Sequence, residues 1–241
     1  MLSNKQLLTT NQENYQDLYR KHQAFLRYPA DWVIRFHNMY LRPNIPGGRL
    51  LDYGCGAGNN SYFFIEQGYE VYGIDVADAA LPLVKRNLES RQLDASLINR
   101  FSIVPPDNIS LPFENDYFDV VLSNQVLYYL ASEEQIRKVC KELSRVLRPG
   151  GAVFFTMMGP PNYYITHHAK QIHNGRVYEI EIDDPSHRLS GLKEMIFLVR
   201  DGDDLKNLFS EFECVSTGYY DESMFDMNST FHWIFVGKKA I

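Results

Sequence analysis

The chain has 241 residues, of which 45% are hydrophobic, and this is enough for one α/β domain with a sizeable core and an insertion. Its net charge is −6 and it has no block of Lys or Arg, which argues against a nucleic-acid backbone as the main partner. The cysteines Cys55, Cys140 and Cys214 make no metal-binding pattern, and their odd number fits a reducing compartment. No apolar run has the length of a signal peptide or of a membrane span. We therefore expect a cytoplasmic protein with no metal and no membrane or nucleic-acid partner.

The N-terminal segment is predicted to be mostly helical. Residues 1 to about 12 are polar and are expected to fray. A helical pattern of aromatic and aliphatic residues then runs over 13–40, and Pro29 divides it into two helices. These helices either pack on a sheet or cover a ligand site.

The stretch 50–60 organises the rest of the chain. An apolar strand leads into three glycines, and a helical pattern follows until Gly68. Glycines permit positive φ and a close approach of a ligand, and the N–H groups of such a turn and helix start face the ligand. The pattern is D-x-G-x-G-x-G, from Asp52 to Gly58. A dinucleotide fingerprint would need a glycine where Asn59 stands, and no P-loop lysine follows.

This spacing resembles the first motif of the class I S-adenosylmethionine-dependent methyltransferases, (D/E)-x-G-x-G-x-G. An ordinary glycine-rich turn between a strand and a helix is the alternative interpretation. The resemblance implies S-adenosylmethionine as cofactor and gives the following candidate binding residues in this stretch: Asp52, Gly54, Cys55, Gly56 and Gly58.

The second predicted strand, 70–75, ends in an acidic residue. Asp75 lies 17 residues after Gly58, and a carboxylate about 20 residues beyond a glycine turn is placed to accept both ribose hydroxyls. A helix N-cap is the alternative, but Asp78 is the better cap because a helical pattern follows it directly. We therefore predict that Asp75, with the adjacent Val76, binds the cofactor.

A third short strand is expected over 100–104, and Pro105-Pro106 ends it. The segment from Asp107 to Phe113 then resembles the D-x-x-x-L-P-F segment of the family. By this resemblance the Asp107 carboxylate accepts the adenine amino group, and the backbone N–H of Asn108 bonds a ring nitrogen. A plain Asp-Asn turn is the alternative.

The fourth strand is predicted over 117–125, with an apolar centre typical of a parallel strand that is buried on both faces. Polar residues arrive at its carboxyl end, where open α/β sheets bind ligands, and Asn124 is a candidate for cofactor binding. Tyr128 and Tyr129 follow in a short apolar turn, and Tyr128 is a candidate for substrate binding.

Ser132 and Gln135 form a capping box, which predicts the start of an amphipathic helix. The helix is expected to end at Arg148-Pro149-Gly150-Gly151, before a fifth strand over 152–158. Helix, R-P-G-G and strand again resemble the methyltransferases. The resemblance therefore covers residues 50 to 158, with four motifs in order.

The segment 159–200 departs from the minimal family pattern. It is rich in tyrosine and contains four of the seven histidines. Its candidates for binding or deprotonating the acceptor are Tyr163, Tyr164, His168 as a general base, and Arg188 as a clamp for a carboxylate or phosphate. Ordinary surface residues on an insertion are the alternative for each histidine. A strand is expected within 189–199.

The C-terminal part is expected to hold a helix from Asp203 and two closing strands over 213–221 and 231–238. By resemblance, the final strand would be the antiparallel edge strand of a seven-stranded sheet. The predicted fold is a single Rossmann-like, doubly wound α/β domain over 1–241, with a mostly parallel sheet and a small cap formed by 1–45 and 159–200.

The predicted function is transfer of a methyl group from S-adenosylmethionine to a small-molecule O, N, S or C nucleophile. In the family, the segment before the glycine motif often covers the cofactor with aromatic residues near the sulfonium, which makes Tyr15 and Tyr19 candidates. A nicotinamide-dependent oxidoreductase and a non-catalytic cofactor-binding subunit remain as alternatives. The sequence does not identify the acceptor or the oligomeric state.

Overall fold

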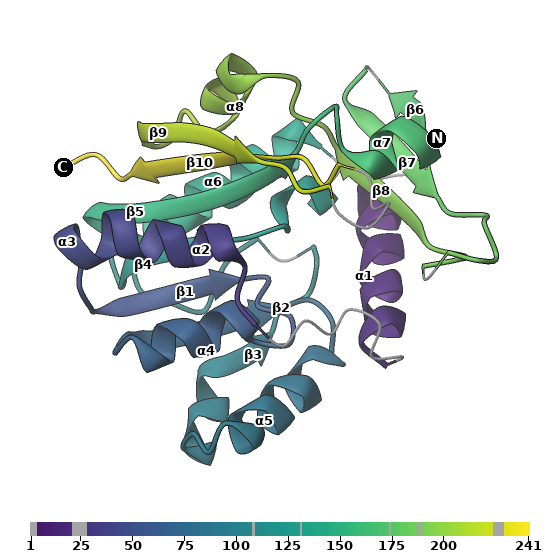
Figure 1. The fold of residues 1–241 in the computed structure, drawn as a ribbon. Coiled ribbons are helices and arrows are strands. Elements are labelled where there is room, and N and C mark those ends of the chain that lie inside the picture. The colour runs from purple at the N-terminus through teal and green to yellow at the C-terminus, as the bar shows by residue number, and fades with distance from the viewer. Residues whose placement is uncertain are drawn as a thin grey trace.

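The computed structural model describes residues 4–20, 28–107, 109–130, 132–173, 175–187, 189–223 and 229–241. Seven strands form the main sheet in the order β3-β2-β1-β4-β5-β10-β9 (Figure 1). Their bounds are β1 (Arg49–Tyr53), β2 (Glu70–Asp75), β3 (Phe101–Ile103), β4 (Phe118–Ser123), β5 (Leu147–Met158), β9 (Glu213–Tyr220) and β10 (His232–Lys238). β1 to β5 are parallel to one another, and β10 is antiparallel to both β5 and β9. The predicted seven-stranded, mostly parallel sheet is confirmed.

The last strand does not lie at the edge of the sheet, so that part of the prediction was wrong. β10 lies between β5 and β9, and β9 is the edge strand. Phe235 of β10 is fully buried and packs on Phe155 and Phe209, with ring centroids 6.3 Å and 5.1 Å apart. The first four residues of β9 are exposed. An apolar strand is better placed between two neighbours than at an edge, where its unpaired N–H and C=O groups would face water.

Helices cover both faces of the main sheet. On one face lie α2 (Asp31–Phe36), the π-helical turn η1 (His37–Leu41), α3 (Arg42–Asn44) and α4 (Asn59–Glu66); on the other lie α6 (Glu133–Val146) and α8 (Gly202–Leu208) (Figure 1). α5 (Ala80–Ser90) packs beside α4 and β3. Residues 31–44, which we expect in the cap from the sequence, thus pack largely on the sheet, where Phe36 contacts Phe154.

Within the described residues, no helix combines the length and apolarity needed to cross a bilayer.

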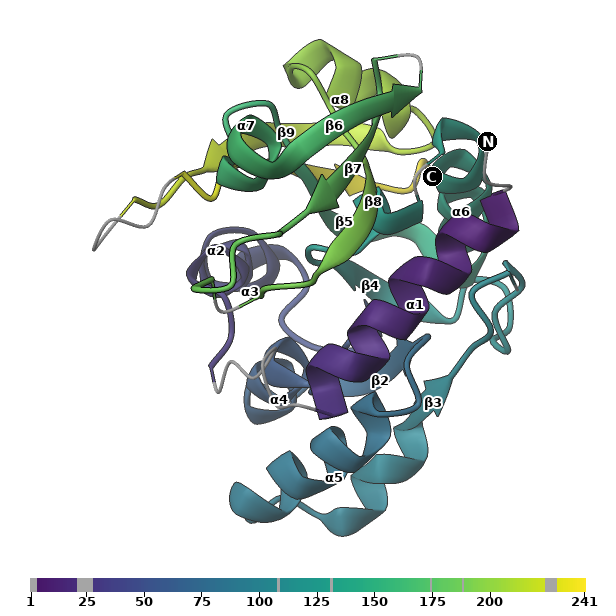
Figure 2. The ribbon, with the colours of Figure 1, turned by 90° about the vertical axis from the view of Figure 1, so that its right-hand side faces the viewer.

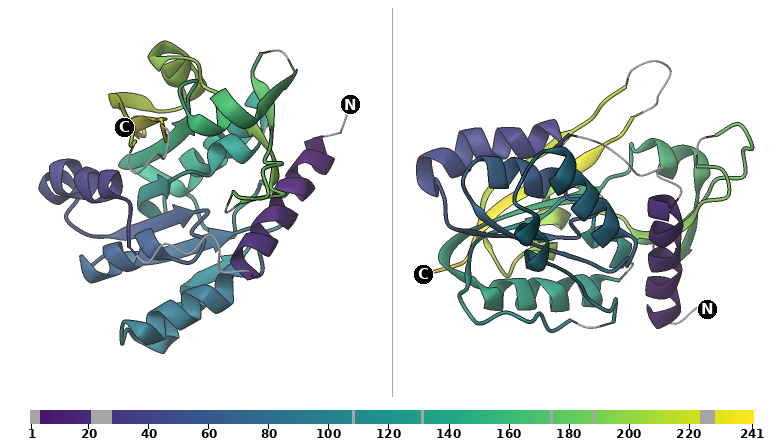
Figure 3. Two further views of the ribbon diagram at one scale, coloured as in Figure 1. Left: turned by 45° about the vertical axis from the view of Figure 1, so that its right-hand side comes forward. Right: turned by 90° about the horizontal axis from the view of Figure 1, so that it is seen from below.

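A second, three-stranded antiparallel sheet forms the cap over the carboxyl ends of the parallel strands. It consists of β6 (Ala169–His173), β7 (Val177–Glu181) and β8 (Lys193–Phe197), and follows the short helix α7 (Tyr163–His168). The expected strand within 189–199 is β8; the other two strands were not predicted. α1 (Asn4–Arg20) runs beside β8 and across the strand ends (Figure 2), and both views in Figure 3 show it apart from α2 and α3.

The side chains of α1 explain why this helix is longer than expected. It begins at Asn4 rather than near residue 13. The Asn11 side chain donates hydrogen bonds to the carbonyls of Tyr129 and Met195, both at 2.8 Å, and accepts one from the Met195 N–H at 3.0 Å. Further along, the side chain of Gln12 donates to the carbonyl of Val76 at 2.7 Å. α1 therefore bridges the cap sheet and the loop after β2, and these long-range bonds hold a polar segment in helical form.

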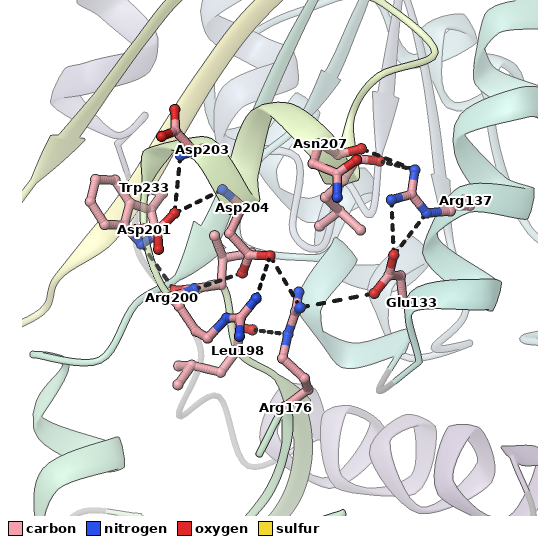
Figure 4. A network of polar contacts seen from close by, with 12 residues as sticks. Glu133, Arg137, Arg176, Leu198, Arg200, Asp201, Asp203, Asp204, Asn207 and Trp233 are labelled. Carbon is pink, nitrogen blue, oxygen red and sulfur yellow. Dashed lines mark hydrogen bonds and ion pairs between the residues drawn. The ribbon is translucent and has the colours of Figure 1, made fainter. Parts of the chain in front are cut away.

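A network of charged side chains joins the cap sheet to the main domain (Figure 4). The Arg176 guanidinium, just before β7, lies 3.1 Å from the Asp204 carboxylate of α8 and 3.9 Å from Glu133 of α6. It also donates to the carbonyl of Leu198 at 3.2 Å. The Asp204 side chain is only 7% exposed, so the network includes a largely buried ion pair.

We expect Arg176→Ala to lower the free energy of unfolding by about 1–3 kcal/mol, because it removes a buried partner of Asp204. Arg200 is the matched control. It contacts the same Asp204 oxygen at 3.3 Å, but its side chain is 60% exposed. Arg200→Ala is expected to cost less than about 1 kcal/mol. Urea unfolding of both variants measures the difference, and equal losses would contradict the anchoring role of Arg176.

Candidate functional site

A cavity of about 740 Å³ lies between the carboxyl ends of the parallel strands, α1 and the cap sheet. Its volume falls within the range of small-ligand sites, roughly 300–1,000 Å³. Its walls come from the glycine loop after β1, the ends of β2 and β4, the 3₁₀ turn η3 (Leu127–Leu130), α1, and strands β7 and β8. Open α/β sheets bind ligands at this end of their strands.

The glycine loop has the backbone that its sequence predicts. Gly54, Gly56 and Gly58 have φ values of +79°, +53° and +83°. A Cβ atom on Gly56 would lie 2.8 Å from the hydroxyl oxygen of Tyr19, which packs over the loop from α1. Glycine is therefore required here both for the left-handed backbone and for the close approach of a side chain. Gly54, Cys55 and Gly56 line the cavity directly.

Asp52 lies behind the loop and is not among the residues that line the cavity. It is 1% exposed and accepts a hydrogen bond from the Ser61 hydroxyl at 2.6 Å. Burial raises the pKa of its carboxyl to about 7. In this structure Asp52 connects β1 to α4 beneath the loop. Gly58, the N-cap of α4, does not line the cavity either.

Asp75 sits at the end of β2 and lines the cavity together with Val76. Its two carboxylate oxygens accept hydrogen bonds from the backbone N–H groups of Gly56 and Ala77, at 2.8 Å and 2.9 Å. Burial raises the pKa of Asp75, and these N–H groups oppose that shift. The carboxylate also has a backbone hydrogen bond from Val76, and of its roughly four lone-pair positions it keeps capacity for a ligand hydroxyl.

The segment assigned to adenine recognition lies only partly at the cavity. Pro106 and Ile109 line it, whereas Asp107 is exposed and does not. Asn108 lies outside the described residues. The roles assigned to Asp107 and Asn108 therefore stay predictions.

The end of β4 contributes Asn124 to the lining, as expected. Its side-chain carbonyl accepts a hydrogen bond from the indole N–H of Trp32 at 2.8 Å. Trp32 in turn stacks on Tyr220, with ring centroids 3.4 Å apart. The cavity wall next to Asn124 is thus a rigid aromatic stack.

The structure brings only some of the acceptor-site candidates to the cavity. Tyr128 and Tyr164 line it, whereas Tyr163 and His168 do not. His168 is half-buried and its Nε2 lies 3.2 Å from the Tyr163 hydroxyl. Burial, followed by the nearby His187 and His167, lowers its pKa. Arg188 lies outside the described residues.

Glu194 of β8 is a cavity residue that the sequence interpretation missed. It is 5% exposed, lines the cavity and hydrogen-bonds to the Tyr129 side chain. Burial raises the pKa of its carboxyl to about 7. A signal was present in the sequence, because the alternation of Leu192, Glu194 and Ile196 places one acid on an otherwise apolar strand face.

His232, the first residue of β10, is a second missed residue of the lining. Its Nδ1 lies 2.6 Å from the carbonyl of Thr230 and must carry the proton, because a carbonyl only accepts. Its Nε2 is therefore a lone-pair acceptor; it is buried and has no partner among the described residues. Burial lowers the pKa of His232 to about 4, so the ring is neutral at physiological pH.

Fold and site together define a class of protein. An antiparallel β10 inserted between β5 and β9, a glycine loop after β1 and an acid at the end of β2 make the class I, Rossmann-like methyltransferase fold. Residues 51–155 match the family model described as "Methyltransferase domain".

Relatives with known names have diverse acceptors. The chain is 28% identical over 49% of its length to a cypemycin N-terminal methyltransferase of Streptomyces, covering 45% of that protein. It is 32% identical over 47% of its length to a tRNA (carboxymethyluridine(34)-5-O)-methyltransferase of Arabidopsis thaliana, covering 25% of that protein. The chain thus spans less than half the length of these curated relatives.

Solved structures are similar over more of the chain. One is the 1,6-didemethyltoxoflavin-N1-methyltransferase of Burkholderia thailandensis, which was crystallised with 1,6-didemethyltoxoflavin and S-adenosylhomocysteine. It is 16% identical, covers 100% of this chain and 92% of its own, and has a TM-score of 0.63. At this identity, the likeness shows the fold.

The buried carboxyl of Glu194 predicts a pH-dependent effect on stability. Its pKa is raised from 4.5 to about 7, so the folded protein binds this proton more tightly than the unfolded chain. The contribution of Glu194 to stability should therefore be lost as pH rises from 4.5 through about 7. Glu194→Gln lacks this loss and should be more stable than wild type by roughly 1–3 kcal/mol at pH 8, with little difference at pH 4.

Urea unfolding at both pH values measures this effect. Glu181→Gln is the matched control, because Glu181 is an exposed residue of the same cap sheet that does not line the cavity. It should show no such pH dependence. A stability difference for Glu194→Gln that is the same at both pH values would contradict a buried, titrating carboxyl.

Proposed function

We propose that the chain is an S-adenosylmethionine-dependent methyltransferase with a small-molecule acceptor. The observation that carries the proposal is the contact between Asp75 and Gly56, which places an acid beside a glycine loop at the cavity wall. Cofactor and acceptor would share this one cavity, with the cofactor against the loop and the acceptor towards η3 and the cap sheet.

The residues present fit this cofactor. The loop N–H groups and Asp75 would hold the ribose and its neighbourhood, with the Asp75 carboxylate accepting from a ribose hydroxyl. Asn59, at the start of α4, lines the cavity and has a buried Oδ1 without a partner among the described residues. Such an orphaned acceptor costs free energy unless a ligand donates to it. Asp107 would reach the adenine amino group.

When bound, the sulfonium of the cofactor supplies an activated methyl group and a good leaving group. The chain supplies position, since reacting atoms must be held about 3–3.5 Å apart. Tyr15 and Tyr19 of α1 line the cavity beside the glycine loop, with ring centroids 5.7 Å apart. Aromatic faces stabilise a nearby cation by roughly 0.5–2 kcal/mol, so these rings suit a sulfonium. They also exclude water from that part of the cavity.

A small acceptor is favoured by the helix that covers the cavity. α1 crosses the strand ends and is held there by hydrogen bonds, from Asn11 to β8 and from Gln12 to the loop after β2. The names of the relatives give the N-terminus of cypemycin, tRNA and N1 of 1,6-didemethyltoxoflavin as acceptors, so similarity alone does not choose among these classes. This helix over the strand ends and the absence of a Lys/Arg block in the sequence favour the small molecule.

We expect Asp75→Ala to weaken S-adenosylhomocysteine binding at least about tenfold, because a hydrogen bond to a charged group contributes roughly 1.5–3 kcal/mol. Asp75 also holds the Gly56 N–H, so Asp75→Asn, which keeps one acceptor oxygen, tests the ligand contact with less disturbance of the loop. Isothermal titration calorimetry measures both variants.

Asp78→Ala is the matched control, since Asp78 is exposed and does not line the cavity. It should bind as wild type does. Unchanged affinity in both Asp75 variants would remove this residue from the site. Binding of NAD⁺ in place of S-adenosylhomocysteine by the wild type would instead favour an oxidoreductase.

A further inference from the structure

We propose that the methyl acceptor is an amine and that Glu194 holds its amino group and accepts its proton. This inference rests on the proposed function and names the acceptor class for the same cavity. Glu194 lies on the cap sheet and is not one of the residues assigned to the cofactor.

Glu194 occupies the cap-sheet wall of the cavity. On β8 it pairs with Ile180 of β7, and both residues line the cavity, as does Leu192 two positions earlier. The surrounding wall is apolar and aromatic. A carboxylate in such a position has no structural use in filling an apolar core, because a leucine or methionine there would pack without the cost of burying a charge.

The carboxylate of Glu194 lacks a cationic partner within the described part of the chain. The adjacent Lys193 forms its ion pairs with Glu179 and Glu181, at 3.2 Å and 3.6 Å, rather than with Glu194. Buried charges in proteins are normally paired. A cationic group on the acceptor would provide the missing partner.

The charged residues that line the whole cavity also favour a cationic acceptor. Among the described residues that line it, two carboxylates occur, Asp75 and Glu194, and neither Lys nor Arg. An acceptor with a carboxylate or phosphate would face like charge without compensation. An ammonium group would meet a complementary charge at Glu194, while Asp75 is engaged at the cofactor end.

Aromatic rings next to Glu194 complete an ammonium site. Tyr129 hydrogen-bonds to Glu194 and packs against both Tyr15 and Tyr128, with ring centroids 5.0 Å and 4.4 Å apart. Three tyrosines line this wall, and aromatic rings attract a cation and supply apolar surface for the carbon body of an amine. The hydrogen bond from Tyr129 also fixes the orientation of the carboxylate.

The proton transfer follows from the chemistry of amines. An ammonium nitrogen has no lone pair, so it must lose a proton before it forms a bond to carbon. The Glu194 carboxylate takes that proton and becomes a carboxylic acid, leaving a neutral amine. The nitrogen lone pair then forms the N–C bond to the methyl group as the C–S bond breaks and its electron pair stays on sulfur. A carboxyl with a pKa near neutral is well matched to this step.

His232 is the other basic side chain that lines the cavity, and its chemistry suits hydrogen bonding rather than proton transfer. Its pKa of about 4 makes it a weak base, but its free Nε2 lone pair is a good hydrogen-bond acceptor. The ring lies against Tyr128, with centroids 5.6 Å apart. It can therefore orient a second donor group on the acceptor without taking the proton.

Binding of small probes to protein saturated with S-adenosylhomocysteine tests the inference. The probes share one carbon body and differ in head group: 2-phenylethylamine, 2-phenylethanol and 3-phenylpropanoate. By calorimetry at about pH 8, we expect the amine to bind at least about tenfold more tightly than the alcohol, and the acid to bind most weakly. Glu194→Gln, which keeps the size of the side chain, should abolish the preference for the amine.

Two controls separate this result from other causes. S-adenosylhomocysteine affinity should stay within about twofold in Glu194→Gln, since a glutamine keeps shape and hydrogen bonding at the cap wall. Glu181→Gln, the same change on the exposed part of the cap sheet, should leave the amine preference intact.

Three results would overturn the proposal: no binding of the amine, preferential binding of the acid, or an equal loss of amine and alcohol binding in Glu194→Gln. Failure of the proposed function would look different, because the wild-type protein would then not bind S-adenosylhomocysteine in the first place. The first titration thus distinguishes the two failures.

Discussion

The hydrogen bonds that the Asp75 carboxylate accepts from the N–H groups of Gly56 and Ala77 are the contact on which the rest of the site depends. They fix the turn after β1 against the end of β2, so two neighbouring parallel strands present one continuous surface. The N–H groups of Gly54 and Cys55 reinforce this by donating to the Ile74 carbonyl. Because the loop is held in this way, its left-handed glycines do not need a bound ligand to keep their geometry.

α1 and the cap sheet then turn this surface into a cavity. Neither encloses the site alone. Asn11 satisfies the backbone of both β8 and η3, and Gln12 satisfies the carbonyl of Val76, so the helix spans the cavity from the cap to the loop after β2. The enclosed space has two chemically distinct ends, a glycine loop with Asp75 and an aromatic wall with Glu194. A methyl donor and a methyl acceptor need such a pair of adjoining subsites.

The sequence predicted the features that depend on local residue order. The D-x-G-x-G-x-G spacing, Asp75 at the end of its strand and the helix N-cap at Ser132 depend on short stretches of sequence, and each is found where expected. Features that depend on long-range pairing were missed. β10 pairs with strands more than ten residues away on both sides, and nothing in 231–238 alone tells an edge strand from an inner one.

The residues of the candidate site also fall into those predicted from local sequence and those that depend on long-range packing. Gly54, Cys55, Gly56, Asp75, Val76 and Asn124 reach the cavity because a motif or a strand end places them there. Glu194 and His232 reach it only through tertiary packing, from a cap sheet and a strand order that the sequence did not reveal. His168 was chosen from composition and does not line the cavity, because a composition rich in histidine does not determine which way a side chain faces.

A crystal structure of the chain with S-adenosylhomocysteine tests most directly whether donor and acceptor share this cavity in the order described. We predict that the ribose hydroxyls bond to Asp75 and that the sulfur faces the wall formed by Tyr128, Tyr129 and Glu194. A ligand bound outside this cavity, or a sulfur turned away from the Glu194 wall, would contradict this arrangement.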